Sequence, residues 1–201
     1  VSDYIGTYCR LIDDVGESAK ESKFLSGENR FYVKQSIFDA IPGEPIAYWV
    51  SRQFIDNFKR GISIDSISTF TGSQNITANN EKYLRMWWEV DYNKIGPDKK
   101  WVFYAKGGDS RKFYGNIVHI VDWSDEARNF YSTNKTSNLL DKEIWYKQGI
   151  TYTMLTSKGA SFRYLPDGCI FDKGGPSIVD LDGNLYYCLG FLNSQVCIDY
   201  L

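Results

Sequence analysis

The chain has 201 residues, of which 43% are apolar and 24% are charged. This composition is typical of a soluble globular protein with one well-buried core, or one core with a smaller appendage. Its 23 basic and 25 acidic side chains give a formal net charge of −2, which excludes a strongly basic nucleic-acid-binding protein but permits a local basic surface. The 15 Tyr, 12 Phe and 6 Trp residues fill cores and also stack on bases or sugars.

The cysteines and the uncharged segments indicate where the protein resides. Cys9, Cys169, Cys188 and Cys197 lack CxxC spacing, so a zinc ribbon is not expected. Their apolar surroundings favour buried free thiols in a reducing compartment, although a Cys188–Cys197 disulfide stays open. The uncharged run 185–198 is too short and too polar to span a bilayer, and no signal peptide opens the chain. We therefore expect a cytoplasmic protein without membrane contact.

The first ninety residues alternate apolar and polar stretches. A helix is predicted from the N-cap Ser51 to Gly61, with Phe54, Ile55 and Phe58 on one face. The other expected elements are a strand over 4–12, a loop or loose helix over 13–29, an apolar segment over 31–41 ended by Pro42 and Pro45, an exposed amide-rich loop over 72–80, and a strand over 83–90 with Leu84, Met86 and Trp88 on one face.

Residues 101–123 organise the middle of the chain. The apolar runs 101–105 and 117–121 are predicted to be strands joined by a mobile connection. This connection carries cations and the pair Gly107-Gly108, whose backbone N–H groups can turn toward an anion. A phosphate backbone is a natural partner for such a loop, and a plain solvated hairpin is the alternative.

The remaining elements complete an α+β prediction. They are a helix starting at Ser124, a hairpin of strands 150–156 and 160–165 around Ser157-Lys158-Gly159, a strand at 169–171 and helical spacing over 185–201. We expect a mixed, largely antiparallel sheet with short helices and long functional loops, and no internal repeat.

Catalytic signatures are mostly absent from the sequence. His119 is the only histidine, and its place inside an apolar run favours a half-buried strand position over a base or a ligand. No Gly-x-Ser-x-Gly elbow, phosphate-binding Gly-Lys loop or dinucleotide fingerprint occurs. A free-standing enzyme is therefore not expected, and no metal site is predicted.

Binding chemistry is better represented. Residues 98–112 contain five cations and two acids, an excess of three in a slightly acidic chain. Phosphate contacts from this stretch would give affinity, while amides of the 72–80 loop and the guanidinium groups of Arg85, Arg111 and Arg163 could read base edges. Two other classes stay open: an aromatic-lined carbohydrate- or peptide-binding module, and a domain that docks onto other proteins.

Six segments in collinear order resemble one family. They are IPGEPIAYWVS (41–51), TANNEKYLRMWWEV (77–90), KGGDSRKFYGN (106–116), GITY (149–152), SFRYLPDGCIFD (161–172) and LGFLNS (189–194). Together they resemble the C-terminal part of the PglX-like adenine-specific DNA methyltransferases of BREX phage-defence systems, which are similar to Eco57I-type restriction–methylation enzymes. The resemblance covers nearly the whole chain.

The resemblance implies a target-recognition region without its catalytic half. Residues 1–50 would be the connecting segment that follows the methyltransferase domain, and 51–201 the target-recognition domain, similar to a TaqI-methyltransferase-like specificity domain and one compact unit with 1–50. The catalytic Asn/Asp-Pro-Pro-Tyr motif and the S-adenosylmethionine loop of the family do not occur here, so the cofactor belongs upstream. Where relatives often have Thr-Gly-Asp-Asn, this chain has Thr77-Ala78-Asn79-Asn80.

The implied partners are double-stranded DNA, the upstream methyltransferase domain and other defence-system proteins. Lys106, Arg111 and Lys112, with Gly107 and Gly108, are the expected phosphate contacts. The residues expected to contact DNA base edges or the nearby DNA backbone are Asn79, Asn80, Arg85, Lys158 and Arg163. Trp87 and Tyr114 would support this surface by packing or stacking.

Overall fold

The computed structural model describes residues 3–69, 73–155, 157–181 and 183–198. The chain divides into two compact units, residues 1–62 and residues 63–201, and each is treated by itself. The expected functional division at residue 50 stays a prediction. The helix predicted from Ser51 to Gly61 lies in the first unit.

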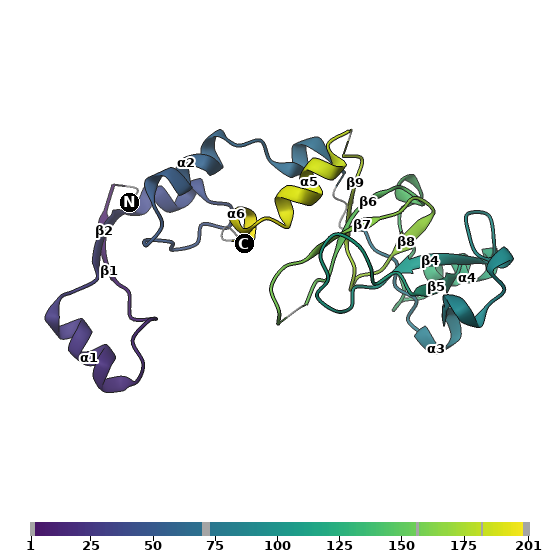
Figure 1. Ribbon diagram of the computed structural model, residues 1–201, viewed down its shortest axis with the longest axis horizontal. Coiled ribbons are helices and arrows are strands. Elements are labelled where there is room, and N and C mark those ends of the chain that lie inside the picture. Colours follow the sequence, from purple (N-terminus) through teal and green to yellow (C-terminus); the bar gives the residue numbers. More distant parts are fainter. Residues whose placement is uncertain (1–2, 70–72, 156, 182, 199–201) are drawn as a thin grey trace. The chain divides into compact units, whose positions relative to one another are not determined.

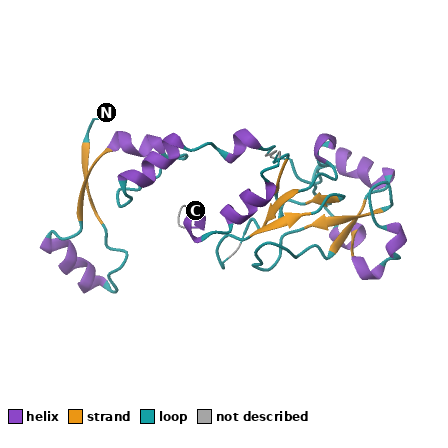
Figure 2. Ribbon diagram, turned by 45° about the horizontal axis from the view of Figure 1, so that its top comes forward, coloured by secondary structure: helices purple, strands orange, loops and turns teal. Residues whose placement is uncertain are grey.

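The first unit is a two-stranded ribbon followed by helices. Strands β1 (Ile5–Cys9) and β2 (Arg30–Lys34) pair antiparallel, with Ile5 opposite Lys34. Helix α1 (Glu17–Ser26) joins them, as Figure 2 shows, and Gly27 ends it in the left-handed conformation at φ 75°. Helix η1 (Gln35–Ala40) and α2 (Arg52–Arg60) follow.

Helix α2 forms as the sequence predicts. The Ser51 hydroxyl accepts the Phe54 amide at 3.1 Å, which satisfies one of the free N–H groups of the first turn. Ile55 is buried, with Phe54 and Phe58 half-buried beside it, and they pack with Ile41 and Ala47. The small core of the first unit therefore depends on one face of α2.

Within the described residues, the second unit holds two sheets. In the four-stranded sheet the strands lie in the order β3 (Leu84–Met86), β5 (His119–Asp122), β4 (Trp101–Ala105) and β8 (Cys169–Phe171). In the three-stranded sheet the order is β7 (Phe162–Leu165), β6 (Gly149–Tyr152) and β9 (Ser177–Val179). All strand pairs are antiparallel except β4 with β8. The predicted α+β class with mostly antiparallel pairing is confirmed. The strands form several small sheets, whereas one mixed sheet was expected.

Short helices surround these sheets (Figure 1). In chain order they are η2 (Ile64–Ile67), α3 (Asn80–Tyr83), η3 (Trp87–Glu89), η4 (Tyr92–Lys94), α4 (Asp125–Thr133), η5 (Lys142–Ile144), α5 (Leu185–Leu192) and α6 (Gln195–Ile198). Helix α4 starts at Ser124 as predicted, and its Tyr131 packs with the fully buried Trp123 in the larger core. Helix α5 covers β6 and β7 with Leu185, Leu189 and Leu192.

Some sequence predictions fail locally. The amide-rich loop 72–80 is not exposed throughout, because Asn75 is 0% and Thr77 3% exposed, and its first residue lies outside the described residues. Asn75 pairs with Asp172 and Ile76 pairs with Asn138 through single β-bridges. Pairing with these distant segments buries part of the loop despite its polar composition. The strand predicted over 83–90 spans only 84–86, because the backbone turns into η3 at Trp87.

The buried Asn193 amide joins the end of α5 to β7. Its Oδ1 accepts the Phe162 amide at 3.1 Å, and its Nδ2 donates to the Phe162 carbonyl at 2.8 Å and the Leu189 carbonyl at 3.0 Å. The residue is 5% exposed, so these backbone groups have little access to water. Removing the amide would leave the Phe162 N–H without a partner and would remove one of the two hydrogen bonds of each carbonyl, since the Phe113 amide also donates to the Phe162 carbonyl and the Asn193 backbone amide to the Leu189 carbonyl.

We expect Asn193→Ala to lower the free energy of unfolding by about 2–4 kcal/mol, because the unsatisfied Phe162 N–H costs about 1–3 kcal/mol and each of the two lost hydrogen bonds to a carbonyl about 0.5–1.5 kcal/mol. Urea unfolding followed by circular dichroism measures this change. The matched control is Asn129→Ala, since Asn129 is exposed on α4. Equal effects of the two substitutions would show that the Asn193 junction contributes nothing specific.

Candidate nucleic-acid interface

The connection between β4 and β5 is anchored to the second sheet. The Phe113 amide donates to the Phe162 carbonyl at 2.8 Å, and the Tyr164 amide donates to the Phe113 carbonyl at 2.9 Å. The loop thus forms a one-residue parallel bridge to β7, with Phe113 in the left-handed region at φ 71°. The two predicted strands pair as expected, but residues 106–116, here named the basic loop, are held by β7 instead of forming a free hairpin tip.

The glycine pair of the basic loop serves close packing. Gly107 is buried at φ 80°, and a Cβ there would collide with the Gly174 carbonyl oxygen. Gly108 is exposed, and its carbonyl accepts the Thr153 hydroxyl at 3.1 Å. Only Gly108 therefore has the exposure that the predicted anion contact needs.

Arg163 lies beneath the basic loop with only 1% of its surface exposed. Its guanidinium donates to the Thr153 hydroxyl at 3.0 Å, the Ser161 hydroxyl at 3.3 Å and the Arg111 carbonyl at 3.4 Å. These acceptors are neutral, its Nε has no partner, and burial lowers the pKa of the side chain. The placement makes Arg163 a support of the basic loop and argues against the predicted contact with base edges.

The other cations of the basic loop differ in the partners that they bind. Lys106 forms an ion pair with Asp172 at 3.0 Å, and Lys112 donates to the Asn193 carbonyl at 3.0 Å while its side chain stays exposed. Arg111 is exposed and forms no ion pair within the described parts of the chain. Tyr114 is 68% exposed. The accessible chemistry of the loop is therefore two cations, two aromatic rings, since Phe113 is also 53% exposed, and the exposed carboxylate of Asp109.

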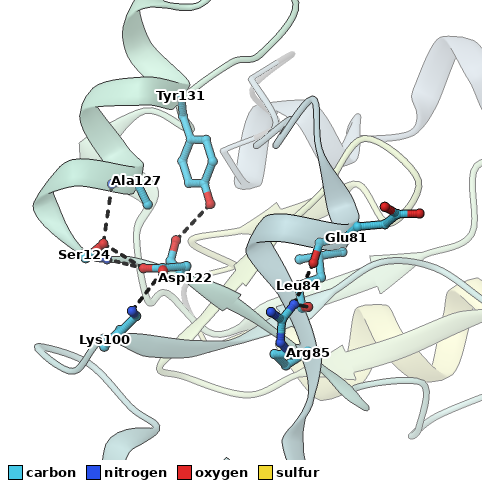
Figure 3. A network of polar contacts seen from close by, with 8 residues as sticks. All are labelled: Glu81, Leu84, Arg85, Lys100, Asp122, Ser124, Ala127 and Tyr131. Atoms are coloured by element: carbon cyan, nitrogen blue, oxygen red, sulfur yellow. Dashed lines mark hydrogen bonds and ion pairs between the residues drawn. The ribbon is translucent and has the colours of Figure 1, made fainter. Parts of the chain in front are cut away.

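A second group of predicted residues lies at α3 and β3. The Asn79 side chain caps α3 by accepting the Lys82 amide at 3.0 Å, and the Asn80 side chain accepts the Thr77 hydroxyl at 2.7 Å. Figure 3 shows the Arg85 guanidinium turned back onto the carbonyls of Glu81 and Leu84, at 2.7 and 2.6 Å. These side chains have structural partners, although Asn79 and Asn80 remain exposed.

The two groups come from different elements of the second unit. Within the described residues, no hydrogen bond links 79–85 to the basic loop. Lys158 lies exposed in the connection between β6 and β7. The structure thus gathers Arg111, Lys112 and Tyr114 on one loop and leaves Asn79, Asn80, Arg85 and Lys158 on other segments.

A series of partly buried hydrogen bonds and one ion pair supports the start of the basic loop. The Tyr104 hydroxyl lies 3.0 Å from the Asn75 carbonyl and 3.3 Å from Asp172, which binds Lys106. Burial raises the pKa of Tyr104 well above its ordinary value. Sequence reasoning missed Asp172 and Asn75, because only the parallel pairing of β4 with β8 brings their segments together.

No protein-family model matches the chain. It is 33% identical to an adenine-specific methyltransferase PglX of Lacticaseibacillus casei over 98% of its own length, and 32% identical to an adenine-specific methyltransferase BrxX of Escherichia coli over 96%. This chain corresponds to one region of the PglX-like BREX methyltransferases. It spans 18% and 16% of these two relatives.

The four cysteines of this PglX-like region are free, with Cys169, Cys188 and Cys197 buried, and burial raises the pKa of the Cys169 thiol to about 12. Among the helices of the described residues, none combines the length and apolar content that a bilayer crossing requires. His119 is half-buried on β5, as predicted, and its Nδ1 has no hydrogen-bond partner.

His119 makes the stability of the PglX-like region depend on pH. Burial and the nearby Lys106 lower its pKa below the ordinary 6.5. As the pH falls through 6.5, the unfolded chain binds the proton before the folded one, so stability is lost toward acid. We expect the urea concentration at the unfolding midpoint to decrease as the pH is lowered from about 7.5 to about 5.5. The carboxylates titrate below this pH range.

The control for this prediction is His119→Asn, which removes the only histidine. Its urea midpoint should change less over the same pH range than that of the wild type. An identical pH dependence in both proteins would contradict the assignment to His119.

Proposed function

We propose that this chain is a DNA target-recognition region of an adenine-N6 DNA methyltransferase in a phage-defence system. The observation that carries the proposal is the basic loop: Arg111, Lys112 and Tyr114 are exposed on a segment that β7 holds in place. Both relatives are named adenine-specific methyltransferases. A methyltransferase that modifies chosen sites needs a surface that grips duplex DNA outside its catalytic pocket.

The basic loop suits phosphate binding. Guanidinium and ammonium groups attract phosphates at long range and then form charge-assisted hydrogen bonds. A loop already fixed by backbone hydrogen bonds loses less conformational entropy on binding than a mobile one. Arg111 and Lys112 are adjacent in sequence, so both can follow one stretch of phosphate backbone.

Lys106 contributes less to this surface than its sequence position suggests. Its ammonium group already pairs with Asp172 at 3.0 Å, and 28% of its side chain is exposed. A phosphate would have to compete with a carboxylate whose own exposure is only 13%. We assign Lys106 to holding the base of the basic loop, and the phosphate contacts to Arg111 and Lys112.

The chemistry of methyl transfer is assigned to the remainder of the parent protein. S-adenosylmethionine would bind there, and the target adenine would be turned out of the duplex into the catalytic pocket. Asn79 and Asn80 are exposed at the start of α3, and their side-chain NH₂ groups can still donate to base edges while their oxygens accept from Lys82 and Thr77. We propose that they contribute to site choice.

We expect Arg111→Gln/Lys112→Gln to weaken binding of the chain to every duplex and to reduce the slope of log K against log salt by about 2, since each phosphate contact contributes about 0.9. Fluorescence anisotropy with labelled duplexes at several salt concentrations measures both quantities. Lys135→Gln removes one exposed charge just after α4 and should leave affinity and slope nearly unchanged. A double variant that keeps the wild-type slope would contradict the phosphate assignment.

A further inference from the structure

The tip of the basic loop is closed on itself. The Asn116 side-chain amide donates to the Asp109 carbonyl at 2.7 Å, and a Cβ built on Gly115 would lie 3.1 Å from Cδ of Arg111. Residues 110–115 therefore form a compact tip whose two ends lie together. Asp109, which is the one acid of the basic loop, lies at this closure and not at the tip.

Phe113 holds a strained backbone at the centre of this tip. The Tyr114 amide donates to the Lys112 carbonyl at 2.9 Å across Phe113, whose φ is 71°. A three-residue turn with positive φ is rare, and a bulky side chain there costs conformational free energy. Glycine or asparagine would adopt this conformation at less cost. The strain persists because both backbone polar groups of Phe113 also bond to β7.

The Phe113 ring gains little from packing within the protein. The residue is 53% exposed, and within the described parts of the chain its ring has no aromatic or cation–π partner. Other exposed rings of this unit, such as those of Trp88 and Tyr92, lie on backbone outside the left-handed region. A strained backbone that exposes an apolar ring is typical of a functional contact.

The side chains beside the ring indicate its partner. Arg111 and Lys112 directly precede Phe113, and Tyr114, which is 68% exposed, directly follows it. Two cations and two rings in succession match duplex DNA, which places phosphates beside flat, apolar base faces. An acidic protein surface would attract the cations but offers no stacked faces for a ring to enter. The duplex is the occupant that uses both chemistries.

We propose that Phe113 is a wedge that enters between two adjacent base pairs of the bound duplex while Arg111 and Lys112 hold the phosphates beside them. This role rests on the proposed function and adds to it a contact with the base stack. The ring exchanges water for base faces, and the opened step bends the duplex. Pyrimidine–purine steps open at least cost, so the wedge favours them without a hydrogen bond to any base.

The test compares a short duplex with the same duplex carrying one abasic site, because the missing base removes part of the cost of unstacking. Fluorescence anisotropy with the whole chain should show about tenfold tighter binding to the abasic duplex, since the ring then gains stacking at little cost. Phe113→Asn removes the ring but introduces a residue that tolerates positive φ, and it should bind both duplexes equally. Phe113→Trp keeps a ring and should keep the preference.

Tyr92→Asn is the matched control, because it removes a similarly exposed ring, at 66%, outside the basic loop. It should keep the wild-type preference for the abasic duplex. Circular dichroism checks that each variant is folded. The preferences of the wild type and of Phe113→Trp decide the outcome if Phe113→Asn does not fold.

The salt dependence separates the wedge from the proposed function. Phe113 is uncharged, so Phe113→Asn should leave the slope of log K against log salt at its wild-type value. Equal wild-type affinities for the two duplexes, a preference that survives in Phe113→Asn, or its loss in Tyr92→Asn would overturn the wedge. A steep salt slope of the wild type would then leave the proposed function standing. A wild-type chain that binds neither duplex would overturn both.

Discussion

The backbone of Phe162 at the edge of β7 is the point on which the candidate interface depends. An edge strand offers unpaired N–H and C=O groups, and here the Asn193 side chain and the Phe113 backbone satisfy them. Arg163 adds hydrogen bonds beneath the same loop. A segment that composition marks as a flexible hairpin tip is thereby tied to a second sheet, and its exposed cations are held in place.

Local patterns can be predicted from neighbouring residues, whereas the surroundings of the candidate site residues depend on contacts between distant segments. Capping by Ser51 and Ser124 and the pairing of β6 with β7 follow from residues close in sequence. The burial of Arg163 and the pairing of Lys106 with Asp172 depend on contacts across many intervening residues. Residue type alone does not distinguish an arginine that supports a loop from one that reads DNA.

The two units carry different chemistry. The second unit presents polar and cationic groups on a loop, which suits a hydrated phosphate backbone. The first unit presents a groove lined by apolar side chains and three cations, and a helix, α1, that carries two glutamates and two lysines and buries none of its residues. The chain spans less than a fifth of the two methyltransferases that it resembles, so each surface is assessed within this one region.

The most direct test of the basic loop as a DNA contact is site-specific photocrosslinking with p-benzoylphenylalanine. The probe replaces Tyr114 in one protein and Tyr92 in another, since both rings are exposed, at 68% and 66%. We predict a crosslink to duplex DNA from position 114, with little or none from position 92. Equal crosslinking at both positions, or crosslinking only from position 92, would contradict the account.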